Sequence, residues 1–253
     1  MLMEQVVQAA RPQLEGRTLQ ELVVGVSMTA CCLSDGRVGV SYMLRDRLPN
    51  GCSVFPYAQS AEGRPAAEIA DWVVCGQDDL QRSIGASVLN AASQGLDIPD
   101  DDRTGLPFGL EPRPGDVIGM VGYIPPIARR LAACGAEMII FDHGAWLEGD
   151  SDVQPTERQE ELLPRCDMAV ITGTSTVNGT IDGLLALCPR AREIVLVGTS
   201  TPMFPVGFRG SGVTRLAGAW WDNAAKDDIF KKVSLAGGIR SLSPHMTLKL
   251  ARV

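Results

Sequence analysis

The first third of the chain alternates between helical and strand-like patterns of apolar residues. Apolar positions recur every three or four residues over Met3–Leu14, which predicts an amphipathic helix. Stretches rich in β-branched and apolar residues at Leu19–Met28, Ala30–Leu33 and Val38–Met43 predict three strands. Asp35-Gly36 suits the tight turn between the last two strands, because this pair tolerates positive φ angles. We therefore expect one helix followed by a small antiparallel sheet.

Two further helices and a turn-rich connection follow this sheet. Helical spacing predicts a helix over Pro65–Cys75 and a second one, capped by Asp78 or Asp79, that runs to about Ala92. Residues 47–63 are expected to form mostly loop, with a turn at Asn50-Gly51-Cys52. The stretch Asp97–Gly115 is rich in Pro and Asp, which indicates a linker. We place a domain boundary within it, giving domains over residues 1–110 and 111–253.

The second domain shows a regular alternation of short apolar runs and helical segments. The runs predict five strands, at Asp116–Val121, Glu137–Phe141, Asp167–Ile171, Glu193–Val197 and Val213–Leu216. Helices are expected at Ile127–Cys134, Gln154–Leu163 and Thr180–Leu187, and a last helix, capped by Asp222 or Asn223, runs to about Ser234. Such alternation is typical of βαβ crossovers, and hence of a parallel sheet covered by helices on both faces. Ligands of such sheets bind beyond the carboxyl ends of the strands.

The turns after the predicted strands contain most of the candidate binding residues. The turns at 172–180 and 198–202 supply many hydroxyls and backbone N–H groups near helix starts, where an anion is stabilised. Ser, Thr and Asn at helix starts also cap helices without any ligand, and this alternative stays open for each single residue. We predict that a bound cofactor or ligand contacts Gly122, Asp142, Thr172, Gly173, Thr174, Ser175, Gly179, Thr180, Gly198, Ser200 and Thr201.

Three further turn residues suit acid, base or orienting roles in catalysis. They are Tyr123, His143 and Asn178. His143 follows Asp142 at a strand end, so these two are also the predicted metal ligands, with an exposed loop histidine as the alternative for His143. No Gly-x-Gly-x-x-Gly follows the first parallel strand and no Walker-type Gly-Lys-Ser/Thr occurs, so the common nucleotide-binding signatures are absent.

Composition excludes several classes of protein. The 253 residues are 45% hydrophobic and 21% charged, which excludes wholesale disorder. A net charge of −7 argues against a nucleic-acid partner. No apolar run approaches the ~20 residues of a membrane span, and no secretory signal is visible. With an odd count of seven cysteines and no Cys-x-x-Cys, we expect a cytoplasmic protein with reduced thiols.

Several segments in combination resemble a known family, the one described as putative heavy-metal chelation and formerly only a domain of unknown function. The similar segments are Val24–Ala30, Gly85–Ala91, Val121–Pro126, Cys166–Thr180 and Val197–Met203. The resemblance implies an α/β fold in which a small α+β, enolase N-terminal-like domain precedes a Rossmann-like parallel-sheet domain. It also implies a shared cleft with a metal or metal-chelate ligand.

Two principal functions therefore follow from the sequence. The first is binding of a small anionic ligand or metal complex in the interdomain cleft, including heavy-metal chelation. The alternative is an enzyme that acts on a small molecule, with an adenosyl- or nucleotide-type cofactor in the Rossmann-like domain. The cofactor is accordingly a divalent or heavy metal ion, an adenosyl compound, or unknown. A third hypothesis is an interaction module built on Trp220-Trp221 and the small-residue helix, and we expect a homodimer alongside either of the first two functions.

Overall fold

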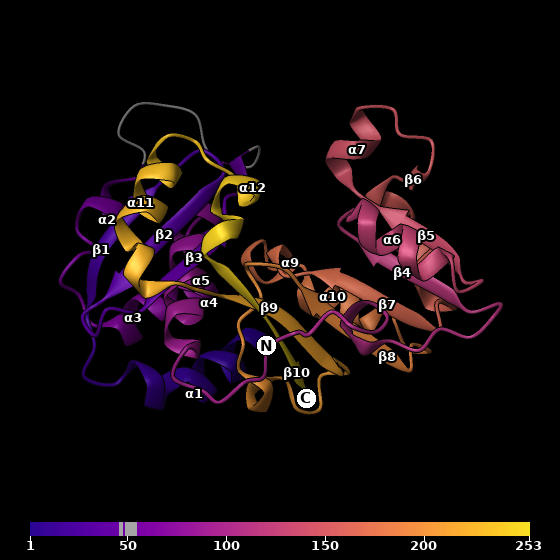
Figure 1. Cartoon of the computed structure of the whole chain (residues 1–253), viewed down its shortest axis with the longest axis horizontal. Coiled ribbons are helices and arrows are strands. Elements are labelled where there is room, and N and C mark those ends of the chain that lie inside the picture. Colours follow the sequence, from indigo (N-terminus) through magenta and orange to yellow (C-terminus); the bar gives the residue numbers. More distant parts are fainter. Residues whose placement is uncertain (46–47, 49–54) are drawn as a thin grey trace.

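The chain folds around two β-sheets, as seen in a computed structural model that describes residues 1–45, 48 and 55–253. One sheet has three antiparallel strands and the other has seven, mostly parallel strands (Figure 1). The turn expected at Asn50-Gly51-Cys52 and part of the loop expected over 47–63 lie outside the described residues. The predicted α/β class, with a small α+β unit before a parallel-sheet unit, is confirmed.

The small sheet is built from the predicted hairpin and the strand before it. It consists of β1 (Leu19–Val24), β2 (Met28–Leu33) and β3 (Val38–Tyr42). The strand predicted over Leu19–Met28 ends early, because the chain turns at Gly25 where a helix packs directly against it. A Cβ atom on Gly25 would lie 2.2 Å from the carbonyl oxygen of Val233.

Helices from the first 93 residues surround one side of this sheet. They are α1 (Leu2–Leu14), α2 (Pro56–Gln59), α3 (Ala66–Ala70), α4 (Trp72–Cys75) and α5 (Asp79–Ser93). The helix predicted over Pro65–Cys75 is divided at Asp71 into α3 and α4. Helix α5 begins where Asp78 caps it by accepting a hydrogen bond from the N–H of Gln81 at 2.8 Å. Almost every residue of α5 is buried, so its small side chains are what let it pack between neighbouring elements.

The large sheet has the strand order β10-β9-β8-β7-β4-β5-β6. Its strands are β4 (Val117–Val121), β5 (Glu137–Phe141), β6 (Val153–Gln154), β7 (Met168–Thr172), β8 (Glu193–Val197), β9 (Arg215–Trp221) and β10 (Met246–Arg252). All neighbours are parallel except β9 and β10. Counted from β4, the six parallel strands have the order 3-2-1-4-5-6, which is that of doubly wound dinucleotide-binding sheets. The strand order reverses between β4 and β7, and we call this place the switch point.

Several bounds in the large unit differ from the predicted ones. Its helices are α6 (Pro125–Ala132), α7 (His143–Leu147), α8 (Gln159–Leu162), α9 (Thr174–Val177), α10 (Ile181–Ala186), α11 (Lys226–Ser234) and α12 (Ile239–Leu242). The helix predicted over Gln154–Leu163 starts instead as β6, and Pro155 separates that strand from the helical turns that follow. The strand predicted at Val213–Leu216 extends to Trp221, because β10 pairs along its whole length. Neither β10 nor α7 was predicted.

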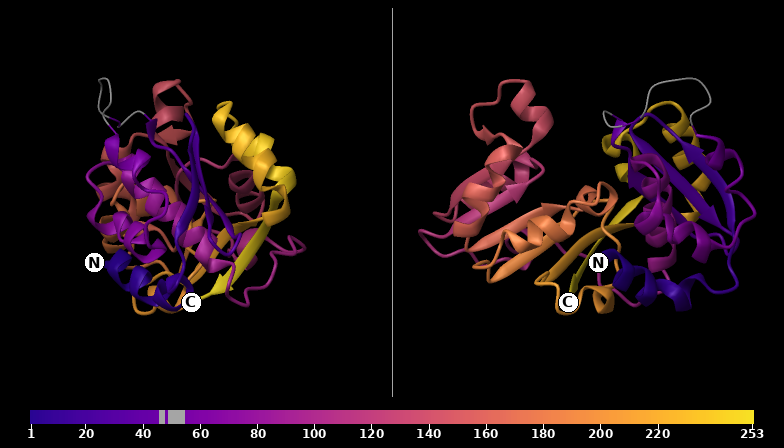
Figure 2. Two further views of the ribbon diagram at one scale, coloured as in Figure 1. Left: turned by 90° about the vertical axis from the view of Figure 1, so that its left-hand side faces the viewer. Right: turned by 180° about the vertical axis from the view of Figure 1, so that it is seen from behind.

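The C-terminal helix α11 packs on the small sheet, on the face opposite α5 (Figures 1 and 2). Its buried side chains Ile229, Phe230 and Val233 share a core with Met28 and Val40 of the sheet. The small sheet therefore obtains one of its two covering helices from the end of the chain. The domain division at about residue 110 stays a prediction.

Buried hydrogen bonds join the small unit to the loop after β8. The Nδ2 atom of Asn90 on α5 donates to the carbonyl oxygens of Val40, at 2.9 Å, and Thr199, at 2.6 Å. The Ser200 hydroxyl accepts from the N–H of Tyr42 at 2.8 Å and lies 3.1 Å from the hydroxyl of Ser41. These contacts fix the two units against each other on the β8 side of the large sheet. In the described part of the chain, no helix has the length and apolar character needed to cross a membrane.

Candidate functional site

The strands β4 and β7 end side by side at the switch point, and a glycine makes this close approach possible. Gly122 follows β4 with φ of 90°, and a Cβ atom there would lie 2.8 Å from the Cβ of Thr172 at the end of β7. The N–H of Gly122 donates to the carbonyl oxygen of Phe141 at 2.8 Å, which ties the turn to β5. A larger residue at position 122 would separate the two strand ends.

Two threonine hydroxyls line the β7 side of the switch point. The Oγ1 atoms of Thr172 and Thr174 are 3.0 Å apart, and both residues are half-buried. The hydroxyl of Ser175 points away, since it donates to the carbonyl oxygen of Thr172 at 2.7 Å and the residue is buried. Of these three hydroxyl residues, Thr172 and Thr174 are therefore the ones that are partly exposed.

Asp142 links the turns after β4 and β5. Its Oδ2 atom accepts a hydrogen bond from the N–H of Tyr123 at 2.9 Å, and its Oδ1 atom accepts one from the N–H of Ala145 at 3.0 Å. The second bond caps α7, so Asp142 has a capping role that requires no ligand. His143 is the first residue of α7 and is exposed, whereas Tyr123 is half-buried.

The remaining predicted site residues fall into two groups. Some are exposed or half-buried, and the others are buried at the junction of the two units. Asn178 is half-buried, and its Oδ1 atom accepts from the N–H and the hydroxyl of Thr180, at 3.1 and 2.7 Å. Gly179 and Thr180 are exposed and Gly198 is half-buried. By contrast, the buried residues Gly173, Ser200 and Thr201 lie where the small unit contacts the β8 loop. The structure thus brings together Gly122, Tyr123, Asp142, Thr172 and Thr174, and it places Ser200 and Thr201 in the junction.

The sequence analysis did not identify the residues that the small unit contributes to this junction. Ser41, Ser83, Ser87 and Asn90 are buried polar residues that contact the sheet, α5 or the β8 loop. The signal for Ser83, Ser87 and Asn90 is that they are polar residues among the small and apolar residues of α5, whereas Ser41 is a single polar residue within β3. Two oxygens in the junction, Asn90 Oδ1 and Thr201 Oγ1, have no hydrogen-bond partner among the described residues.

A site for a bare metal ion has little support in the described residues. Within residues 1–45, 48 and 55–253, no three or more His, Cys, Asp or Glu side chains are grouped so that they could hold an ion. Burial raises the pKa of Cys31 to about 12, and it raises those of Cys166 and Cys188 to about 11. Burial at these three cysteines thus favours the neutral thiol over the thiolate, which is the form that metals bind.

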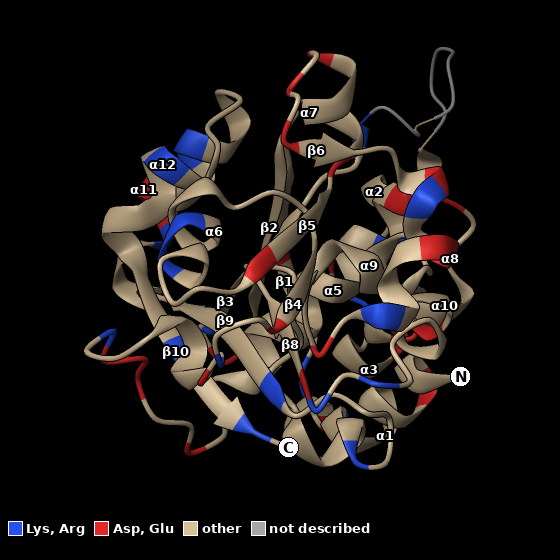
Figure 3. Cartoon of the chain, turned by 90° about the vertical axis from the view of Figure 1, so that its right-hand side faces the viewer, with Lys and Arg blue, Asp and Glu red and all other residues tan. Residues whose placement is uncertain are grey.

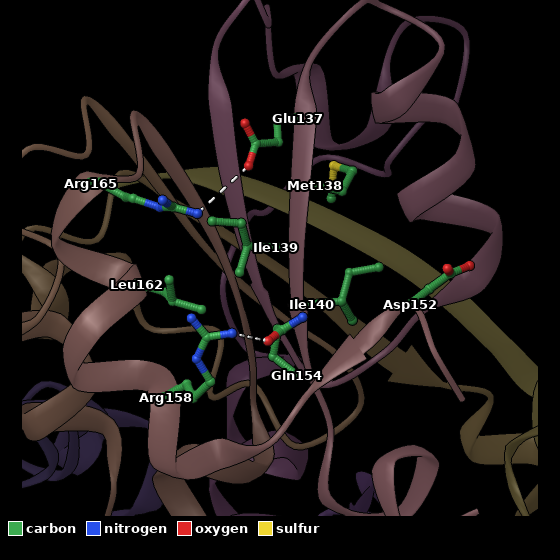
Figure 4. Close-up of a pocket in the computed structure, with 9 residues that line it drawn as sticks. All are labelled: Glu137, Met138, Ile139, Ile140, Asp152, Gln154, Arg158, Leu162 and Arg165. Atoms are coloured by element: carbon green, nitrogen blue, oxygen red, sulfur yellow. Dashed lines mark hydrogen bonds and ion pairs between the residues drawn. The ribbon is translucent and has the colours of Figure 1, made fainter. Parts of the chain in front are cut away.

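A separate cavity of about 150 Å³ lies beside residues 137–140 of β5 (Figure 4). Arg158 and Arg165 point into it, but each has an anionic or polar partner. Arg158 donates to Gln154 at 2.6 Å and forms a two-point ion pair with Glu161, and Arg165 lies 3.7 Å from Glu137. None of the predicted site residues lines this cavity, so it is distinct from the switch point.

Comparison with known sequences gives two matches to family models. Residues 7–93 match one model and residues 106–252 match another, and both models are described as putative heavy-metal chelation. An uncharacterised protein of Methanocaldococcus jannaschii is 27% identical over 146 residues, which cover 55% of this chain and 54% of that protein. The chain thus spans about half the length of this curated relative.

Two solved structures have the same fold along the whole chain. A protein of unknown function from the DUF364 family of Pyrococcus horikoshii superposes with a TM-score of 0.80, at 21% identity, and the match covers 100% of both chains. A DUF364 protein of unknown function from Desulfitobacterium hafniense gives the same TM-score of 0.80, at 24% identity, with 99% of both chains covered. At these identities the likeness shows the fold alone.

Proposed function

Because the chain belongs to the family described as putative heavy-metal chelation, we propose that it binds a small anionic ligand, in particular a metal chelate, at the switch point. The observation that carries this proposal is the pairing of Gly122 with Thr172 and Thr174. The glycine lets the end of β4 approach the side chain of Thr172, whose Cβ would lie 2.8 Å from a Cβ at position 122, and the half-buried hydroxyls of Thr172 and Thr174 lie together at this place. Open parallel sheets bind their ligands at this position.

The donors at the switch point favour a chelate over a bare ion. Threonine hydroxyls donate hydrogen bonds to the oxygens of a carboxylate, whereas a heavy metal ion prefers thiolate or imidazole ligands. A chelate brings its own metal ligands and presents oxygens to the protein. The chain then has to bind and orient the chelator, and Thr172 and Thr174 are the residues that would do so.

A second candidate is the binding of an adenosyl- or nucleotide-type cofactor. The strand order supports it, and Asp142 follows the second strand from the switch point, where an acidic residue often holds a ribose. Against it, both Asp142 oxygens already accept backbone hydrogen bonds. Catalytic roles for Tyr123, His143 and Asn178 belong to this second candidate and stay predictions.

Replacing Thr172 by valine tests the proposed site. The change keeps the shape of the side chain and removes one hydroxyl. We expect it to weaken the binding of Zn²⁺–dipicolinate and Zn²⁺–citrate about tenfold, the effect of one lost hydrogen bond to a charged group. Isothermal titration calorimetry on the wild type and the variant measures this change.

The matched control is Thr247→Val. Thr247 is an exposed threonine on β10, three strands away from β7. Its replacement should leave both affinities unchanged. Equal affinities in the wild type and in Thr172→Val, with the melting temperature preserved, would falsify the proposed site.

A further inference from the structure

The turn that contains Thr172 and Thr174 packs directly against the loop after β8. Gly173 lies between the two threonines, and a Cβ atom on it would lie 2.6 Å from the Oγ1 atom of Thr201. The N–H of Gly173 donates to the carbonyl oxygen of Val197 at 2.6 Å. A larger residue would push the turn and the loop apart, so the position of the turn depends on the position of the loop.

The small unit holds the same loop through buried hydrogen bonds. The Ser200 hydroxyl accepts from the N–H of Tyr42 at 2.8 Å and lies 3.1 Å from the hydroxyl of Ser41. The carbonyl oxygen of Thr199 accepts from the side chain of Asn90 at 2.6 Å. Helix α9, which follows the turn, also contacts α5 of the small unit. A continuous series of contacts therefore joins the small unit to the two threonines of the switch point.

No charged side chain takes part in this series of contacts. Strand β3, helix α9 and residues 198–204 contain no Lys, Arg, Asp or Glu, and Figure 3 draws β3 and α9 in tan. Neutral hydrogen bonds and close packing act only at short range, whereas charges act over about a Debye length of 10 Å. The small unit can therefore affect the turn through the position of the β8 loop.

We propose that Ser200 is a positioning residue of the switch point. It fastens the β8 loop to the small unit, and the loop holds Gly173, so that the two threonine hydroxyls stay 3.0 Å apart. This inference rests on the proposed function and requires no contact between Ser200 and the ligand. A ligand that bridges both hydroxyls binds more tightly when their spacing is fixed beforehand, because less conformational freedom is lost on binding.

Replacing Ser200 by alanine tests this role, because the change removes the acceptor of the Tyr42 N–H. We expect the affinities for Zn²⁺–dipicolinate and Zn²⁺–citrate to fall about fivefold, which is typical of an effect transmitted through a contact network. Ser211→Ala is the matched control. The Ser211 hydroxyl accepts from the N–H of Val213 at 3.2 Å, before the start of β9 and so at the opposite edge of the parallel sheet. Both affinities should be unchanged in this variant, even if its melting temperature falls.

Hydrogen exchange in the wild type tests the reciprocal effect. If the junction favours binding, a bound ligand must stabilise the junction by the same free energy. Saturating Zn²⁺–dipicolinate should therefore slow exchange of the Tyr42 amide by a larger factor than exchange of the Val213 amide. Both amides donate to a serine hydroxyl, but only that of Tyr42 does so across the junction.

Three results would overturn the inference. They are wild-type affinities in Ser200→Ala, an equal loss of affinity in Ser211→Ala, and equal slowing of the two amides by the chelate. In those cases sensitivity to Thr172→Val would still support the proposed function. Failure of both chelates to bind the wild type would overturn the inference and the proposed function together.

Discussion

Replacing Gly39 by alanine is expected to lower the free energy of unfolding by about 4 kcal/mol or to prevent folding. Gly39 lies in β3, directly under α5. A Cβ atom there would lie 2.0 Å from the carbonyl oxygen of Ser87 and 2.5 Å from the backbone nitrogen of Ala91. Both neighbours are backbone atoms of a buried helix and cannot rotate away. The strand and the helix would have to separate, and urea-induced unfolding measures the loss.

Gly183→Ala is the matched control for this substitution. Gly183 lies inside α10, and a Cβ atom added to it would meet no described atom within 4 Å. Alanine has the higher helix propensity, so this variant should gain up to about 1 kcal/mol. The two glycine-to-alanine changes are thus predicted to have opposite signs. A Gly39→Ala protein within about 1 kcal/mol of the wild type would show that β3 and α5 are not packed as described.

The second large effect is expected at Asn90, which joins the two units. Asn90 is 2% exposed, and its Nδ2 atom supplies hydrogen bonds to Val40 on β3 and Thr199 after β8. Alanine would leave two carbonyl oxygens without this donor and would create a cavity in the junction. We expect Asn90→Ala to lower the free energy of unfolding by about 3 kcal/mol.

Gln94→Ala provides the comparison for Asn90→Ala. Gln94 follows α5 and also donates to two carbonyl oxygens, but it is only half-buried, so water can replace its side chain. A loss of about 1 kcal/mol is expected there. Urea unfolding and limited proteolysis report on both variants, and Asn90→Ala should also increase cleavage between the units. Equal, small losses in the two variants would contradict a buried junction at Asn90.

The parallel strands of the second half were predictable because β4, β7 and β8 each bury a short continuous apolar run. The sequence placed β5 and β8 at their observed bounds and indicated that the strand ends would carry the candidate site. It did not indicate α7, whose five residues are too few to show a periodic pattern. It also missed β10, in which buried and half-buried residues do not alternate regularly.

The junction was not predictable because residue patterns do not say which element faces which. Ser200 and Thr201 lie beyond a parallel strand, and Thr172 ends one, yet Ser200 and Thr201 are buried at the junction whereas Thr172 is half-buried. The packing of α11 on the small sheet is a similar case, since its apolar face would suit either sheet. Ser200 and Thr201 as ligand contacts, the homodimer and the cytoplasmic location stay predictions.

A crystal structure of the protein with Zn²⁺–dipicolinate tests the central claim most directly. The account predicts density for the chelate beyond β4 and β7, with its carboxylate oxygens within hydrogen-bond distance of the Thr172 and Thr174 hydroxyls. Density confined to the cavity between Arg158 and Arg165, with the switch point filled only by water, would contradict it.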